Sequence, residues 1–149
     1  MRTDASHILT TFQTDLFTSI VPALDGNYLA GRAAVIAIGC NLLAQYCDAE
    51  VDNLYNDNLA LQALFKSTVE VISNAELAAK LQAAIALQSP SLCVRDVAAL
   101  NDQLNTLFIE VQAYIEGSQS AEEQSLEIKY LRHLEASAQR RAVEMLSMG

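Results

Sequence analysis

Apolar residues recur every three or four positions through most of the chain, a spacing that places them on one side of an α-helix. The first stripe begins near Thr3 or Asp4, either of which can cap a helix, and ends where Pro22 interrupts the pattern. Its apolar members are Ile8, Leu9, Phe12, Leu16 and Ile20. The next residues, "LDGN" at 24–27, are typical of a turn.

The segment 28–47 differs because small and apolar residues cover several of its sides, and residues 33–47 include no charge. Such a surface lets neighbouring helices approach closely from more than one direction. We therefore predict that the helix 28–47 is central in the fold. Gly39 lies in its interior, where glycine costs about 1 kcal/mol relative to alanine. We expect a close helix crossing at Gly39, or else a ligand lying against it.

A membrane-spanning role is not expected for this segment. A spanning helix needs about 20 consecutive apolar residues, whereas Asn41 and Gln45 interrupt a run that Arg32 precedes and Asp48 follows. The N-terminus also mixes polar residues into the place of a signal peptide's apolar region. These features predict a cytoplasmic protein that contacts no membrane.

The stretch "DAEVDNLYNDN", residues 48–58, collects four acidic residues and lacks the glycine and the ligand spacing of a calcium loop. We interpret it as a solvated acidic turn that leads into a third helix reaching about Ile72. Two S-x-x-E sequences, at 73–76 and 120–123, predict further helix starts through capping boxes. The clearest amphipathic stripe lies between them and consists of Val97, Leu100, Leu104, Leu107, Phe108, Val111 and Ile115.

These patterns predict an all-α, single-domain bundle of five or six helices spanning residues 1–149. The 5 glycines and 2 prolines leave few helix breakers, and 149 residues suffice for a core without a metal or disulfide. Cys40 and Cys47 lie about 10 Å apart along one helix, so we expect free cysteines, buried as small core residues. A net charge of −9 and a pI near 4.5 disfavour nucleic acid as a partner.

Catalytic signatures are missing from the sequence, and no metal or cofactor is predicted. Neither His7 nor His133 follows a glutamate by three residues, as di-metal bundles require. The chemistry concentrates instead in "KYLRHLEASAQRR", where Arg132, Arg140 and Arg141 could hold a phosphate or carboxylate.

The alternative is that these basic residues complement the helix dipole and pair with acids such as Glu135 and Glu144. Arg32, beside the apolar segment, is open to the same two interpretations. His133 is a candidate for the same anion site or a packing residue. The candidate ligand-binding residues are therefore Arg32, Gly39, Arg132, His133, Arg140 and Arg141.

Four stretches, "TDASHILTTFQTDLFTSIVPALDGN", "RAAVIAIGCNLLAQY", "DVAALNDQLNTLFIEVQ" and "LEIKYLRHLEASAQRRAVE", together resemble a family of small helical bacterial proteins of unknown function. Members of that family tend to be encoded beside acyl-CoA dehydrogenases and aminoglycoside-phosphotransferase-like kinases. The resemblance covers about half of the chain. It implies a link to acyl-CoA metabolism, with an acyl-CoA pathway enzyme as a partner, and it supplies no catalytic residue.

We expect a non-enzymatic accessory or protein-interaction bundle. The alternatives are a small-molecule binding bundle that holds an acyl chain or a CoA-like anion between helices, and an enzyme of unfamiliar chemistry. A pocket rimmed by Arg32 or Arg132 favours binding, whereas a solid core with an exposed apolar stripe favours protein association. We also predict a homodimer formed mainly by residues 94–147. The candidate seam residues are Leu104, Phe108, Val111, Leu131 and Leu134.

Overall fold

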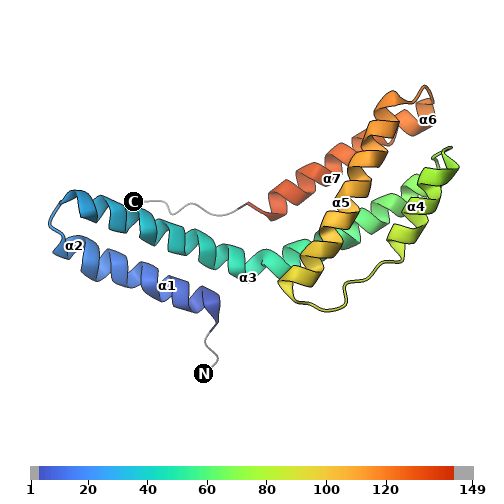
Figure 1. Cartoon of the computed structure of the whole chain (residues 1–149). Helices are drawn as coiled ribbons and strands as arrows, with labels where there is room; N and C mark the ends of the chain where they lie inside the picture. Colours follow the sequence, from blue (N-terminus) through green and yellow to red (C-terminus); the bar gives the residue numbers. More distant parts are fainter. Residues whose placement is uncertain (1–3, 143–149) are drawn as a thin grey trace. The chain divides into compact units, whose positions relative to one another are not determined.

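The computed structural model of the chain describes residues 4–142, and all the regular elements in that range are helical (Figure 1). The predicted all-α class is confirmed. The elements are α1 (Ala5–Asp15), the π-helix η1 (Leu16–Ile20), α2 (Val21–Ala23), α3 (Tyr28–Val69), α4 (Ala75–Ile85), α5 (Val94–Gly117), α6 (Ala121–Gln124) and α7 (Glu127–Arg140).

The chain divides into two compact units. Within the described residues, unit 1 comprises residues 4–50 together with residue 142, and unit 2 comprises residues 51–141. The long helix α3 contributes its first part to unit 1 and its second part to unit 2. Each unit has its own packing and is described separately.

Unit 1 is a helical hairpin in which α1, η1 and α2 run back along the first part of α3 (Figure 1). Asp4 caps α1, since its Oδ1 accepts a hydrogen bond from the His7 amide at 2.8 Å. The predicted turn follows α2, with Asp25 at φ 43° and Gly26 at φ 71°. Both residues lie in the left-handed region, which aspartate tolerates and glycine favours.

Small side chains form the packed side of α3 in this hairpin. The buried residues are Ala30, Ala33, Ala37 and Ala44, whereas α1 contributes no buried residue. Asn41 lies on the same side and donates from Nδ2 to Oε1 of Gln13 at 3.1 Å. Gln45 in turn donates to Asn41 at 2.8 Å. The two polar residues that interrupt the apolar run therefore belong to the contact between α3 and α1.

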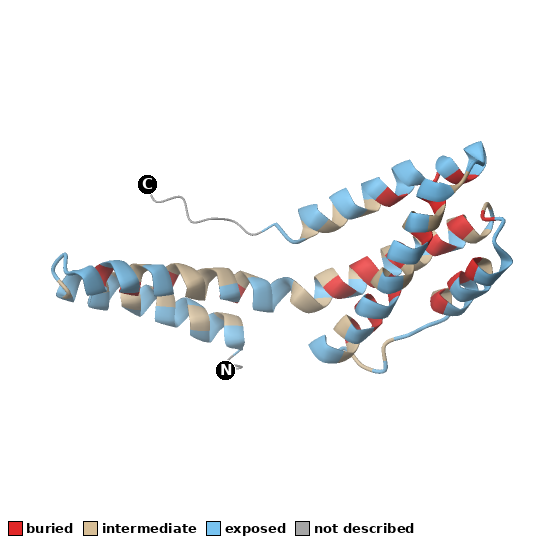
Figure 2. Cartoon of the chain, turned by 45° about the horizontal axis from the view of Figure 1, so that its top comes forward, coloured by how far each residue is buried: buried red, intermediate tan, exposed pale blue. Residues whose placement is uncertain are grey.

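The predictions for residues 28–58 need two corrections. Residues 28–47 are not surrounded by other helices, because unit 1 packs one side of the segment and leaves its large apolar residues in solvent (Figure 2). The acidic stretch 48–58 is not a turn, because α3 continues through it to Val69. No glycine or proline occurs after Gly39 in this helix, and separated carboxylates are compatible with helical backbone.

Unit 2 is a bundle of α3, α4, α5, α6 and α7 around a shared apolar core, and most of the buried positions lie there (Figure 2). The predicted stripe on α5 faces this core. Leu104 and Val111 are fully buried, and Phe108 stacks on Tyr130 of α7 with ring centroids 4.7 Å apart. Two core side chains, Leu61 and Phe65, come from α3.

Of the two predicted capping boxes, one forms in part and the other does not form. Ser120 caps α6 as expected. At the start of α4 the cap is Asn74, whose Oδ1 accepts from the Leu77 amide at 3.1 Å. Ser73 does not cap α4, because its amide and its hydroxyl both donate hydrogen bonds to Glu123. The predicted burial of the cysteines is also wrong for Cys47 and Cys93, which are exposed, while Cys40 is half-buried.

Candidate functional site

A buried carboxylate collects the basic residues at the end of α7. Asp57 of α3 is 2% exposed, and its oxygens accept from Ser137 at 2.8 Å and from Arg141 Nη2 at 2.7 Å. Arg140 donates to the same carboxylate through Nε at 3.1 Å and through Nη2. Burial acts to raise the pKa of Asp57, but the hydrogen bonds from Arg140 and Ser137 and the charge of Arg141 outweigh it and lower the pKa. Asp57 is therefore ionised at neutral pH.

His133 lies on the same helix as a packing residue. Its ring is tilted against Phe108 with the centroids 5.6 Å apart. Burial lowers the pKa of His133, the Asp57 charge opposes this shift, and the nearby Arg140 and Arg141 add to it. The imidazole is thus neutral at neutral pH. Arg132 is exposed and does not join the group around Asp57.

The interpretation of Arg140 and Arg141 as ion-pair partners fits the structure, although the acid is Asp57 on α3 and not Glu135. Glu144 lies outside the described residues. Since the two guanidinium groups share one buried carboxylate, the cluster fixes the end of α7 on α3. It is a structural ion-pair cluster within unit 2. Because Asp57 partly neutralises Arg140 and Arg141, these arginines attract an added anion less strongly than free arginines would.

Asp57 is not among the residues predicted from the sequence, because the acidic stretch was interpreted as a solvated turn. A signal was present, since Asp57 falls three residues after Leu54 and four before Leu61, in the apolar stripe of α3. Both of those leucines are buried. A charged residue at such a position needs a buried partner.

A second buried carboxylate, Glu123, ties the other end of unit 2 together. Its oxygens accept from the Ser73 amide and the Ser73 hydroxyl, both at 2.7 Å, from the Tyr114 hydroxyl at 3.1 Å, and from Ser118. These bonds, led by that from Ser118, lower the pKa of Glu123 to about 2. These bonds join Glu123 to the loop before α4, to Tyr114 of α5 and to Ser118 after α5, so Glu123 serves as a structural clamp.

A cavity of about 320 Å³ lies in unit 2 between α3, α5 and the loop after α4. Its lining carries no charged side chain and consists of Tyr55, Asn58, Leu59, Gln62, Ile85, Leu87, Gln88, Ser89, Leu92, Val97 and Leu100. Gln62 donates to the Leu87 carbonyl at 2.7 Å, and Asn58 donates to the Val97 carbonyl at 3.1 Å. Neither Arg32 nor Arg132 lines it. The cavity offers a small, neutral space.

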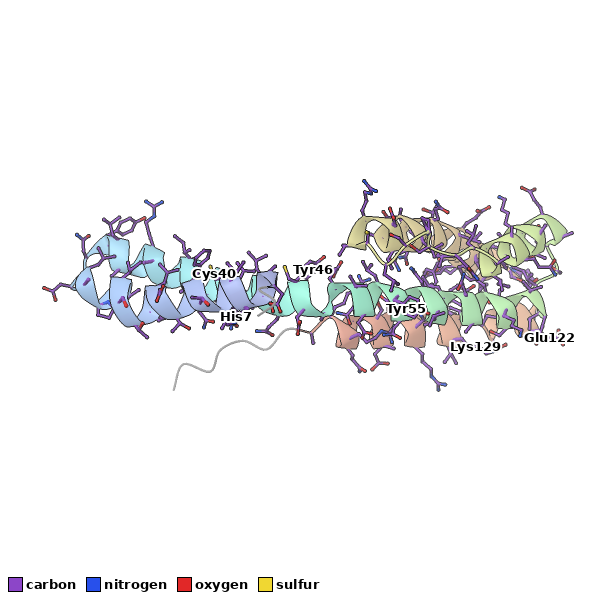
Figure 3. All side chains as sticks on the ribbon, turned by 90° about the horizontal axis from the view of Figure 1, so that it is seen from below. His7, Cys40, Tyr46, Tyr55, Glu122 and Lys129 are labelled. Carbon is purple, nitrogen blue, oxygen red and sulfur yellow. The ribbon has the colours of Figure 1, made fainter. Side chains whose placement is uncertain are left out.

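Several large apolar side chains are exposed on one side of the first part of α3. Tyr28 is 79% exposed, Val35 is 68% exposed and Ile36 is 58% exposed. At about 100° per residue they lie on the side of the helix away from the buried alanines. Figure 3 draws the side chains of this stretch and labels Cys40 and Tyr46 on it. We call this side the α3 face and define it by Tyr28, Arg32, Val35, Ile36, Gly39, Leu42, Leu43 and Tyr46.

Two of the candidate ligand residues, Arg32 and Gly39, belong to the α3 face. Arg32 borders an open depression with Gly26, Asn27 and Tyr28 rather than the mouth of a buried site. The predicted close crossing at Gly39 is not found, since a Cβ built there meets nothing within 4 Å. The reason is that α1 packs on the alanine side of α3 and leaves the glycine side uncovered.

The predicted dimer seam is only partly at the surface. Leu131 and Leu134 of α7 are exposed, whereas Leu104, Phe108 and Val111 of α5 fill the core of unit 2. The α5 stripe therefore faces its own chain. An exposed apolar stripe was the feature expected to favour protein association over ligand binding. In the structure such a stripe lies on α3 instead.

Comparison with known proteins gives no matching family model, no matching curated protein and no matching solved structure. The resemblance drawn from the sequence and the link to acyl-CoA metabolism stay predictions. Within residues 4–142 no group of three or more histidine, cysteine, aspartate or glutamate residues is arranged to hold a metal ion.

The length and composition of α3 bear on the prediction that no segment spans a membrane. By length and composition alone it could cross a bilayer, and 17% of its most apolar window is buried in the structure. The prediction against a spanning helix rests on the interruptions at Asn41 and Gln45 and on the charges of Arg32 and Asp48, which the longer helix does not change, and it stays a prediction. The cytoplasmic location stays a prediction.

Proposed function

We propose that the chain is a non-enzymatic interaction protein that binds another protein through the α3 face. The observation that supports this function is the exposure of Val35, Ile36 and Leu43 on one side of an ordered helix. Large apolar side chains gathered on one surface mark an association site more often than isolated ones do. Ordinary packing does not account for them, because unit 1 uses the alanine side of α3 to hold α1.

The two buried carboxylates support a non-enzymatic role. Asp57 and Glu123 have depressed pKa values and their oxygens are bonded to side chains and backbone of the same unit. Neither borders the cavity of about 320 Å³, although Glu123 borders an open depression elsewhere in unit 2. Groups held in this way stabilise the helical bundle that carries α3.

Affinity capture from a lysate of the native cell tests the proposal. The full chain and the variants Val35→Glu and Leu43→Glu are used as bait, with Leu131→Glu on α7 as the matched control. We expect proteins retained by the wild-type chain to be lost with both α3 variants and kept with the control. Retention that is unchanged by Val35→Glu and Leu43→Glu overturns an interaction role for the α3 face.

The cavity of about 320 Å³ supports a second candidate, the binding of a small molecule. Because its lining is uncharged, it suits a short acyl or alkyl chain better than a CoA-like anion. Fluorescence titration with a short acyl probe tests this candidate, and Ala98→Phe beside Val97 serves as a control outside the lining. Saturable binding that Leu59→Trp removes supports it, whereas binding unaffected by Leu59→Trp contradicts it.

A further inference from the structure

We propose that the occupant of the α3 face is a second copy of this chain, packed antiparallel so that Arg32 of each copy meets Glu50 of the other. This inference rests on the proposed interaction role of the α3 face and names its partner. The pairing places two identical faces against each other about a two-fold axis beside residue 41. Such self-complementary contacts are the commonest form of homo-oligomer interface.

The register follows from two charges on this side of α3, Arg32 within the α3 face and Glu50 about one turn beyond Tyr46. Arg32 and Glu50 are 18 residues apart, which is about five helical turns, so they project on the same side of α3. Residues 33–47 between them carry no charge. Asp48 ends the uncharged run two residues before Glu50, but at about 100° per residue it projects on the alanine side.

An antiparallel pair centred on residue 41 brings each Arg32 opposite the partner's Glu50 and joins the apolar residues between them. Among the described residues, neither Arg32 nor Glu50 has an ion-pair partner within the chain. A parallel pair would instead place like charges opposite each other at both ends. Charge complementarity therefore selects the antiparallel arrangement.

The packing of unit 1 also favours a second hairpin as the occupant. Within its described residues, the two-helix hairpin is held by four alanines and has no enclosed core of large side chains. Two hairpins that join through their exposed faces complete a four-helix arrangement, in which Val35, Ile36 and Leu43 become interior. Gly39, open in one copy, leaves room for a close approach of the second helix.

Light scattering of the purified full chain at tens of micromolar tests the pairing. We expect twice the monomer mass of 16.2 kDa for the wild-type chain. Arg32→Glu and Glu50→Arg are each expected to weaken dimerisation about tenfold, because each single reversal creates two like-charge contacts by symmetry. The double variant Arg32→Glu with Glu50→Arg restores the dimer. Asp48→Arg and Arg95→Glu are charge-matched controls that leave it unchanged.

The outcomes separate this inference from the proposed function. A monomer mass for the wild-type chain, or a dimer unaffected by either single reversal, overturns the antiparallel pairing. If that monomer still captures a cellular protein through Val35 and Leu43, the interaction role stands and the occupant is a different protein. Sedimentation of the chain with neutral phosphatidylcholine vesicles, lost in Val35→Glu, overturns the pairing in favour of a membrane surface.

Discussion

Arg141 Nη2 lies 2.7 Å from Oδ2 of Asp57, although 84 residues separate the two in the chain. This ion pair, together with the one from Arg140, attaches the C-terminal end of α7 to the second part of α3. The carboxylate is covered, while the side chains of Arg140 and Arg141 are 31% and 48% exposed. Solvent can therefore stabilise the arginines more easily than the aspartate.

Replacing Asp57 with asparagine should lower the free energy of unfolding by about 2 kcal/mol. The variant keeps the shape of the side chain but removes the charge that Arg140 and Arg141 share. Urea denaturation followed by circular dichroism measures the loss. Asp52→Asn, an exposed position on the same helix, is the control and should change stability little. A loss at Asp57 no greater than at Asp52 would contradict a stabilising role for the cluster.

Glu123 should make unit 2 sensitive to acid. Its pKa is about 2 in the folded chain, against an ordinary value of 4.5. The stabilisation is thus fully present above pH 4.5 and is lost as the pH falls toward 2. Because the carboxylate borders an open depression, we expect a contribution of about 1 to 2 kcal/mol after solvent screening.

Stability curves of Glu123→Gln and the wild-type chain should therefore differ at neutral pH and converge as the pH approaches 2. Glu122→Gln removes a neighbouring exposed carboxylate and serves as the control. A constant difference between Glu123→Gln and wild type across this range would show that protonation of Glu123 does not control stability.

Periodicity predicted well those elements whose partners lie within the same chain. The α5 stripe from Val97 to Ile115 faces the core, with Leu107 half-buried, although three of its residues were also predicted at a dimer seam. Asp4 and Ser120 cap helices as expected. In these cases the local pattern and the tertiary packing require the same arrangement.

The predictions failed where local signals competed with distant partners. Ser73 has the sequence of a cap, but it lies beside Glu123, 50 residues away, and a charged acceptor outweighs a neutral backbone bond. For residues 28–47, the sequence shows that the helix is apolar on several sides but not which side meets α1. In the structure the small alanines pack against α1 and the larger residues are exposed. Which side is buried depends on how closely the two helices approach, and the spacing of apolar residues does not determine that distance.

Gly39 and Gly26 should respond in opposite ways to replacement by alanine. At Gly39 a Cβ meets nothing within 4 Å in a helical backbone, so Gly39→Ala should stabilise the helix by about 1 kcal/mol. At Gly26 the φ of 71° disfavours any side chain, so Gly26→Ala should destabilise unit 1 by about 1 kcal/mol. Thermal melts measured below the dimerisation range check both values. If Gly39→Ala instead destabilised the monomer, another helix would have to pack closely against this glycine.

The buried hydroxyls of Thr68 and Tyr130 lie 3.2 Å apart, and the donor and the acceptor of their hydrogen bond can be assigned. Thr68 donates its hydrogen to the Leu64 carbonyl at 2.9 Å, so its oxygen accepts from Tyr130. Burial raises the pKa of Tyr130 to about 12, which keeps this donor protonated at neutral pH. The Tyr130 hydroxyl therefore uses Thr68 as its hydrogen-bond acceptor, whereas the Thr68 hydroxyl donates to the Leu64 carbonyl.

This asymmetry predicts unequal costs in a double-mutant cycle. Thr68→Val leaves a buried donor on Tyr130 without an acceptor and should cost about 2 kcal/mol, whereas Tyr130→Phe removes that donor and should cost about 1 kcal/mol. The double variant should cost less than the sum, because a phenyl ring without the hydroxyl no longer needs the acceptor. Urea denaturation of all four proteins at neutral pH measures the coupling. Additive costs, or a greater loss for Tyr130→Phe than for Thr68→Val, would contradict the assigned direction of the bond.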